Sequence, residues 1–280
     1  MLLVLGTFAG SFLNVVIHRL PRGESIVRPR SRCPACGQTI RWYDNVPLLS
    51  FVLLGARCRR CQGRISWRYP LVELLCGLLW AALFLRFGPG KAFAVHLVFC
   101  SALLAVCFID IDFRIIPNEI SLPGIALGLG GSFLWYEQGF HWESILGLLV
   151  GGGGLLLVSL LYALLRGREG MGMGDVKLLG MLGAWLGWKS LLFIVLFASI
   201  QGVLVTLGMV VGGVQLKPPL PEEGEEPEQE LASQMSGQAE AGPQGVPFMA
   251  AAIPFGPFLA LAAVEYLFLG PWFYGLLRGA

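Results

Sequence analysis

Residues 92–111, AFAVHLVFCSALLAVCFIDI, form an almost unbroken apolar run that carries a carboxylate, Asp110, near its end. A helix needs about 20 apolar residues to cross the hydrocarbon core of a bilayer. The whole chain of 280 residues is 55% hydrophobic and only 14% charged, and its mean hydropathy is +0.70. Soluble domains carry about 25% charged residues. The composition therefore excludes an ordinary soluble enzyme and favours a membrane protein.

Seven further apolar stretches surround this one, at residues 1–17, 71–87, 120–136, 144–165, 176–188, 190–213 and 251–275. Inside lipid the backbone must satisfy its own hydrogen bonds, which runs rich in Leu and Ala do as helices. We therefore predict an all-α polytopic membrane protein with about eight transmembrane helices, the sixth and seventh meeting at Trp188-Lys189. The first stretch lacks a basic start and a clear cleavage site, so we expect a retained helix rather than a signal peptide.

The net charge of +2 conceals two regions of opposite sign. Residues 218–247 contain seven Glu and no Lys or Arg, and outside them 20 Lys and Arg stand against 11 Asp and Glu. Basic short loops face the cytoplasm. If residues 18–70 are cytoplasmic, alternation of the spans places 16 of the 20 Lys and Arg on that side. Both termini then lie outside, and no large soluble basic domain remains that would favour nucleic-acid binding.

This pattern divides the chain into a first transmembrane helix (1–17), a small cytoplasmic module with four cysteines (18–70), helices 2–7 (71–213), an acidic linker (214–250) and a last transmembrane helix (251–280). The linker sequence PLPEEGEEPEQE is typical of a disordered segment. An acidic docking tail for a basic partner is the alternative interpretation of its charge.

The cysteines of the module have the spacing of a metal site. The knuckles CPAC and CRRC are separated by 21 residues, and the four ligands would be Cys33, Cys36, Cys58 and Cys61. Four thiolates complete the tetrahedral shell of one zinc ion. Since no ligand position stays open, and since the module is too small for much core, we expect a structural zinc that supplies folding energy. A disulfide pair, which is rare in a reducing cytoplasm, and an iron or redox site are the alternatives.

Two carboxylates are predicted at the cytoplasmic ends of spans. Asp110 ends the third span, and Asp175 opens the sixth in GMGDVK. Two carboxylates within hydrogen-bonding range share a proton, so that one can activate a water toward a peptide carbonyl while the other donates to its oxygen. That chemistry is aspartic-type amide hydrolysis. The alternative is that each Asp marks the membrane interface or caps a helix, with Asp175 as the N-cap.

Neighbouring residues could support this pair. Asp112 follows Asp110 by two positions, which is about 200° around a helix, so we expect it to meet Arg114 or water. Gly172 and Gly174 would let a substrate backbone approach the second carboxylate closely.

A run of glycines, Gly151–Gly154, has the composition of a phosphate-binding loop. It lies inside an apolar span and no strand precedes it. Close packing between helices is therefore the favoured interpretation.

Several motifs follow one another in a recognisable order, namely GSFLNVVIHRLP (10–21), the two C-x2-C knuckles, YPLVE (69–73), IDID (109–112), EGMGMGDVK (169–177) and IPFGP (253–257). In this order they resemble the type IV prepilin peptidases, over nearly the whole chain apart from the acidic linker. The GxGD element alone is also shared with presenilin-like and archaeal preflagellin peptidases.

The resemblance implies a bacterial inner-membrane enzyme that cleaves the basic leader of type IV prepilins and type II secretion pseudopilins at the cytoplasmic membrane edge. It also implies methylation of the new N-terminal amine with S-adenosylmethionine, and it matches the cysteines to the zinc module of the members with both activities. Implied partners are the substrates, membrane lipid and the pilus or secretion assembly machinery. By motif, the catalytic pair is Asp110 and Asp175, supported by Gly172, Gly174, Lys177 and Asp112.

The methyl donor's site is harder to locate, because the sequence lacks the strand, Gly-rich turn and helix that often hold S-adenosylmethionine. A pocket between the first span and the module would draw on Asn14, Arg19, Glu24 and Glu73, each of which could instead have a packing or snorkelling role. Two other hypotheses stay open. One is a peptidase without methyltransferase activity, and the other is a zinc-stabilised scaffold or proton-coupled transporter, although transporter sites usually lie near the bilayer midplane.

Overall fold

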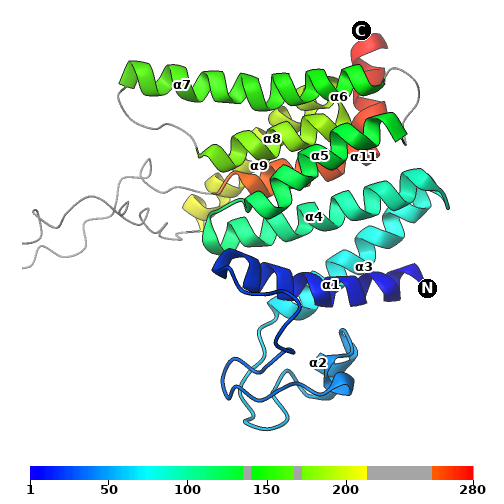
Figure 1. Cartoon of the computed structure of the whole chain (residues 1–280), viewed down its shortest axis with the longest axis vertical. Helices are drawn as coiled ribbons and strands as arrows, with labels where there is room; N and C mark the ends of the chain where they lie inside the picture. The colour runs from blue at the N-terminus through cyan, green and yellow to red at the C-terminus, as the bar shows by residue number, and fades with distance from the viewer. Residues whose placement is uncertain (135–139, 167–171, 213–253, 280) are drawn as a thin grey trace, which may run out of the picture. The chain divides into compact units, whose positions relative to one another are not determined.

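The computed structural model describes residues 1–134, 140–166, 172–212 and 254–279. The helices there, in chain order, are α1 (Leu2–Arg19), α2 (Leu49–Leu53), α3 (Arg68–Phe87), α4 (Lys91–Phe113), α5 (Asn118–Leu134), α6 (Phe140–Leu148), α7 (Gly154–Arg166), α8 (Met173–Leu186), α9 (Trp188–Val211) and α11 (Gly256–Gly279) (Figure 1). A π-helical turn, Leu149–Gly153, joins α6 to α7. Within these ranges there is no strand, only two isolated β-bridges in the module. The all-α fold class is confirmed.

Within the described part of the chain, six helical segments are long and apolar enough to cross a membrane, namely Leu2–Arg22, Arg68–Phe87, Lys91–Phe113, His141–Arg166, Trp188–Val211 and Gly256–Leu276. They match six of the eight predicted spans. The other two are α5 and α8, helices of 17 and 14 residues, so the number eight stays a prediction. The acidic linker (214–250), Ile253 and residues 167–171 lie outside the described residues.

The boundary between the sixth and seventh spans was expected at Trp188-Lys189, but it lies slightly earlier. Helix α8 ends at Leu186 and α9 already begins at Trp188. Gly187 separates them with φ +81°, a left-handed conformation that only glycine adopts readily. The apolar pattern alone does not reveal this break.

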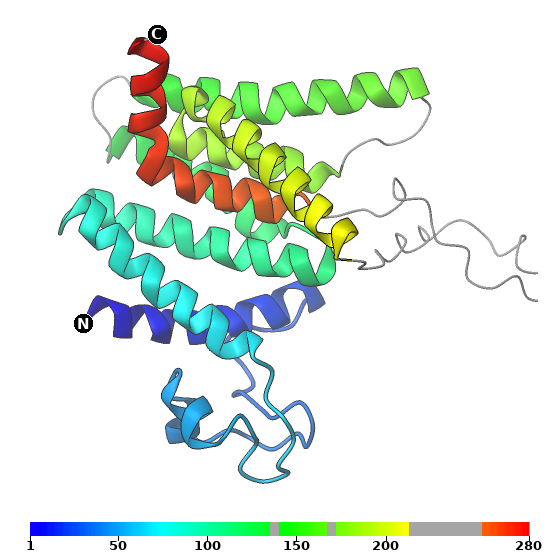
Figure 2. The same cartoon turned by 180° about the vertical axis from the view of Figure 1, so that it is seen from behind.

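Two compact units divide the chain: Met1–Ser199 with Phe255–Ala280, and Ile200–Pro254. Every site described below lies in the first unit. There α4 contacts α1 and α3 on one side and α11 on the other (Figures 1 and 2). The largest buried cluster joins α4 and α8, where the rings of Phe99 and Trp185 stack with centroids 4.6 Å apart. This core fixes the helices that carry the two predicted catalytic aspartates.

Glycines let α1 and α3 touch along their backbones. A Cβ on Gly6 would lie 2.7 Å from the Cα of Gly77, and one on Gly10 would lie 2.7 Å from the Cα of Glu73. Real side chains essentially never make such contacts, so these positions require glycine. Close backbone approach through small residues is how helices associate in membranes. The pairing holds Glu73 of α3 directly against α1.

Close backbone contact through glycines also joins α6 and the π-helical turn that follows it to α8. Gly147 and Gly183 are in backbone contact, and a Cβ on Gly151 would lie 2.7 Å from the carbonyl oxygen of Leu179. The interpretation of the Gly151–Gly154 run as a helix-packing element is confirmed for its first half, whereas Gly153 and Gly154 face no neighbour within 4 Å. This contact fixes the position of α8 and therefore the position of Asp175.

Candidate active site and metal centre

The two predicted catalytic aspartates come together at one end of the helix bundle. Asp110 lies in the last turns of α4 and is buried, and Asp175 lies in the first turn of α8 and is half-buried. The carboxylates are close enough for their charges to repel each other. The backbone N–H of Gly256, at the start of α11, donates a hydrogen bond to Asp110. Three helices far apart in sequence therefore build this site.

The alternative interpretation of Asp175 as a helix cap does not hold. Helix α8 begins at Met173 with Gly172 as its N-cap, and the N–H of Asp175 already bonds to the Gly172 carbonyl at 3.2 Å. The N-cap position is therefore held by Gly172 and not by the Asp175 side chain.

The glycines around the pair have different surroundings. A Cβ on Gly256 would lie 2.5 Å from Oδ2 of Asp110, and one on Gly174 would lie 3.2 Å from the Cβ of Ile116. Gly172 faces open space within 4 Å. Of the two glycines predicted to admit a substrate backbone, Gly172 therefore has room beside it, whereas Gly174 packs against Ile116.

Two polar pairs surround the carboxylates. The Nζ of Lys177 donates to Oδ1 of Asn118 at 2.7 Å, which ties the start of α8 to the start of α5. Asp112 was expected to meet Arg114 or water, but it forms an ion pair with Arg68 of α3. The sequence could not reveal this pair, because it depends on the close contact between α3 and α4.

The four cysteines form one cluster, in which all four Sγ atoms lie within 4.8 Å of one another. The Sγ atoms of Cys33 and Cys61 are 3.9 Å apart. Backbone N–H groups of Cys61 and Arg60 donate to Cys58 and lower the pKa of its thiol to about 7, which favours the thiolate that binds metal. The donor set fits a tetrahedral zinc ion.

The two knuckles have the same backbone structure, offset by 25 positions. An N–H to carbonyl bond joins Cys33 to Gln38 at 2.9 Å, and its equivalent joins Cys58 to Gly63 at 2.9 Å. The residue after each second cysteine is left-handed, namely Gly37 at φ +67° in one knuckle and Gln62 at φ +56° in the other. Each knuckle thus presents two sulfur atoms from one tight turn.

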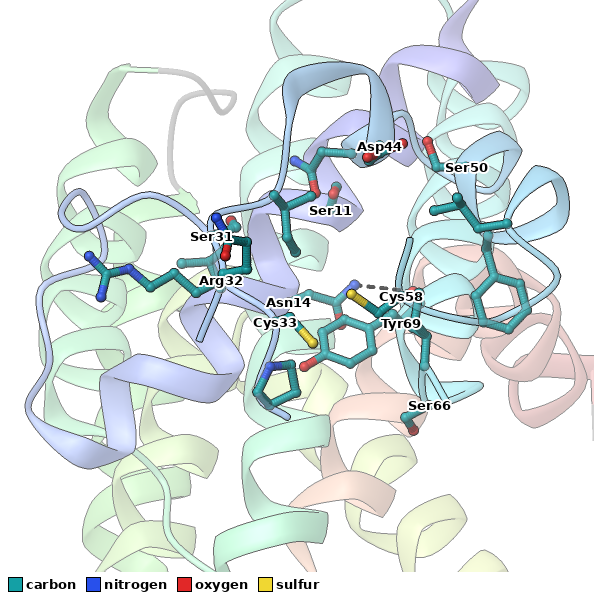
Figure 3. Close-up of a pocket in the computed structure, with 18 of the residues that line it drawn as sticks. Ser11, Asn14, Ser31, Arg32, Cys33, Asp44, Ser50, Cys58, Ser66 and Tyr69 are labelled. Atoms are coloured by element: carbon teal, nitrogen blue, oxygen red, sulfur yellow. Dashed lines mark hydrogen bonds between the residues drawn. The ribbon is translucent and has the colours of Figure 1, made fainter. Parts of the chain in front are cut away.

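A cavity of about 950 Å³ lies between α1, the module and the start of α3 (Figure 3). This volume is within the range of ligand pockets, roughly 300–1,000 Å³. All four residues predicted to hold the cofactor line it, namely Asn14, Arg19, Glu24 and Glu73. Asn14 donates from Nδ2 to the carbonyl of Tyr69 at 3.1 Å, shown as the dashed line in Figure 3.

Glu73 is the buried carboxylate of this cavity. Its Oε2 accepts the backbone N–H of Leu48 at 2.9 Å, and the Ser11 side chain also interacts with it. Leu48 is held at φ +59°, where a leucine is strained. Two of the predicted metal ligands, Cys33 and Cys58, line the same cavity.

Sequence reasoning missed several residues of both sites. The motif IPFGP contains Gly256, and a glycine followed by Pro before an apolar run signals a helix start. Asn118 carries a different signal, because Asn is a residue type favoured at the start of a helix. No local signal marks Leu48 or Arg68, because their roles depend on contacts between distant elements.

The sequence matches known protein families over most of its length. Residues 4–87 match the Bacterial Peptidase A24 N-terminal domain, and residues 97–207 match the Type IV leader peptidase family. A prepilin leader peptidase/N-methyltransferase from Myxococcus xanthus is 39% identical over 97% of this chain and 90% of that protein. The chain belongs to this family.

Other members support the same assignment. The prepilin leader peptidase/N-methyltransferases of Stutzerimonas stutzeri and Burkholderia pseudomallei are 36% and 35% identical to the chain. These alignments cover 96% and 99% of the chain, and 89% and 87% of the two relatives. No solved structure matches the chain. The resemblance found in the motifs is confirmed, and the chain is a multi-pass membrane enzyme of the prepilin peptidase/N-methyltransferase family.

Proposed function

We propose that the chain carries out the two reactions named in its relatives at two separate sites, with leader cleavage at Asp110 and Asp175. The supporting observation is the meeting of these carboxylates, from α4 and α8, beside the start of α11. Cleavage is hydrolysis. A water adds to the scissile carbonyl carbon, its proton passes to one carboxylate, and the nitrogen of the departing peptide accepts a proton as the C–N bond breaks.

Each carboxylate has a distinct environment, which suits the two roles. The N–H of Gly256 donates to Asp110, and this bond stabilises its ionised form, so Asp110 is suited to be the base that activates water. Asp175 lies beside that negative charge, so it is the member that holds the shared proton and donates to the carbonyl oxygen. Gly172 leaves space for the substrate backbone next to α8.

The active site and the module are proposed to face the cytoplasm, with both termini outside. The observations behind this are the basic loops and the placement of Asp110 and Asp175 at helix ends. A prepilin presents a basic leader followed by an apolar helix, so its scissile bond would lie at this edge. We also propose that the cleaved pilin then passes to the pilus or type II secretion machinery.

The cysteine cluster is proposed to hold one structural zinc ion. Four thiols within 4.8 Å of one another leave no ligand position for substrate, and the module around them has little core. Its role would be to shape the cavity wall, since Cys33 and Cys58 line that cavity.

The cavity beside α1 is proposed to bind S-adenosylmethionine, whose methyl group would be transferred to the new N-terminal amine. Its lining fits the ligand, because the carboxylates of Glu73 and Glu24 can face the positive sulfonium and ammonium groups, and Tyr69 and Asn14 offer an aromatic ring and an amide. Arg19 lies at the same cavity, although its guanidinium bonds to the carbonyls of Ser25 and Pro29. The methyl donor supplies the electrophile, and the protein holds the amine and accepts its proton.

The cleavage site is tested by Asp110→Asn and Asp175→Asn in the zinc-loaded chain in detergent. Both variants should lose prepilin cleavage by at least about 10³-fold, because neither amide can share a proton with its partner. Glu143→Gln, which alters a carboxylate paired with Lys189 on α9, should cleave normally. Cleavage by either Asn variant at the normal rate would contradict the assignment and would favour the scaffold or transporter hypothesis.

A further inference from the structure

The module carries an exposed apolar surface that the two proposed sites do not use. It consists of Leu49, Val52 and Leu53 of α2, with Trp42 and Trp67 beside them, and we call it the α2 surface. The side chains of Val52 and Leu53 are 72% and 74% exposed, and those of Trp42 and Trp67 are 82% and 75% exposed. Soluble surfaces rarely gather so many large apolar side chains, so this surface needs a partner.

Hydrogen bonds fix the depth of α2 relative to the membrane helices. The N–H of Leu48, immediately before α2, bonds to Glu73, which is five residues inside α3 from its start at Arg68. At 1.5 Å per residue this is about 8 Å along the helix axis. Glu73 also interacts with Ser11, which is eight residues, about 12 Å, before the end of α1 at Arg19. Leu48 therefore lies well to the membrane side of both helix ends.

The arrangement of the ribbon agrees with this depth. In Figure 1, where α1 runs across the view, α2 lies below the middle of α1, whereas the rest of the module lies below the end of α1 that leads into it. The lipid-facing side chains of α3 at this level are exposed too, as Leu71 and Leu74 show. The α2 surface is thus continuous in depth with helix surface that must face lipid.

The surrounding residues have the chemistry of a membrane interface. Trp67 packs edge-on against Phe51 of α2 with ring centroids 4.8 Å apart, and tryptophan favours the headgroup level. Exposed arginines, including Arg41, Arg57 and Arg64, lie in the same module, and Arg41 and Arg64 line its cavity. Arginines on the same module as an interfacial helix are attracted to anionic lipid headgroups.

We propose that α2 is an interfacial helix whose apolar surface is embedded in the bilayer, with exposed arginines of the module attracted to anionic headgroups. Because Ser50 and Phe51 of α2, and Leu48 just before it, line the 950 Å³ cavity, that cavity adjoins the lipid. A product whose N-terminal segment is an apolar membrane helix could then reach the cavity along the bilayer. This last step rests on the proposed function, whereas the embedding of α2 does not.

The test uses the full zinc-loaded chain in nanodiscs of phosphatidylethanolamine and phosphatidylglycerol. A photoreactive p-benzoylphenylalanine replaces Leu53 in one variant and Val27, an equally exposed apolar residue of the module that does not line the cavity, in a matched control. After irradiation, mass spectrometry should find lipid adducts on the peptide that carries position 53 and at least tenfold fewer at position 27. Both variants must retain one zinc per chain, and position 52 serves in place of 53 if zinc is lost.

Two results would overturn the proposal. One is equal lipid labelling at both positions, or none at position 53. The other is cross-linking of position 53 mainly to a second copy of the chain, which would make the α2 surface a contact between protomers. Prepilin cleavage by the same samples is a separate readout, so failure of the lipid proposal and failure of the cleavage proposal are distinguishable.

Discussion

At the scale of single residues, the module with the four cysteines places two different residues in the same backbone conformation. Gly37 and Gln62 occupy equivalent left-handed positions after the second cysteine of each knuckle. A residue with a side chain raises the conformational free energy at such a position by roughly 1–2 kcal/mol. Glycine adopts it without this strain, although it loses more conformational entropy on folding. The second knuckle is therefore the more strained of the two.

This difference predicts opposite effects of two substitutions on metal retention. Gln62→Gly should slow zinc loss to a competing chelator, and Gly37→Ala should accelerate it. About 1 kcal/mol corresponds to roughly a fivefold change in either direction. The measurement is colorimetric zinc release from the purified chain at fixed chelator concentration. Faster release from Gln62→Gly would show that the side chain, and not backbone strain, governs this knuckle.

At the scale of helices, the position of Asp175 depends on contacts between glycines. Helix α8 is only 14 residues long, and its neighbours hold it through Gly147, Gly151 and Gly183. Without a hydrophobic driving force between helices in lipid, such close packing is a main source of association. A larger residue must push α8 away and displace the carboxylate that it carries.

Gly147→Val should therefore destabilise the protein by about 1–3 kcal/mol, the usual cost of overpacking, and should also slow prepilin cleavage. Gly130→Val is the matched control, since Gly130 is helical and has no neighbour within 4 Å of its Cβ position. Thermal unfolding in detergent measures the first effect, and initial cleavage rates measure the second. Equal behaviour of the two variants would contradict the packing role of Gly147.

Sequence reasoning predicted most helices but not the contacts that complete the sites. Apolar runs place α4 and α9 within two residues of their observed bounds, because length and composition alone define a span. The hydrogen bond from Gly256 to Asp110 and the ion pair of Arg68 with Asp112 join elements far apart in the chain. No pattern in one sequence encodes such pairings. The four cofactor candidates line one cavity because the first span, the module and the start of α3, on which they lie, surround it.

At the scale of the whole molecule, the carboxylate pair belongs to α4 and α8, whereas the cavity belongs to α1, α3 and the metal module. The ion pair between Arg68 and Asp112 connects the two regions. Two sites on separate elements should respond separately to perturbation. Metal removal is the simplest case, because it acts on one region only.

Chelation of zinc should abolish methylation and leave most leader cleavage intact. A zinc ion on the four cysteines would supply folding energy to the module, so the wall of the cavity that contains Cys33 and Cys58 should unfold without it. The carboxylate pair shares no residue with that wall. Both activities are measured on the same detergent sample before chelation, after it, and after zinc is restored. Loss of cleavage in parallel with methylation would indicate that the module also supports the peptidase site.

The most direct test of the two-site account is mass spectrometry of the pilin N-terminus after reaction with Asp175→Asn or Glu73→Gln in the presence of S-adenosylmethionine. Asp175→Asn should leave prepilin uncleaved but should methylate a pilin supplied without its leader. Glu73→Gln should release the leader at the normal rate and yield an unmethylated N-terminus. Loss of both reactions in either variant, with zinc retained, would contradict the separation of the two sites.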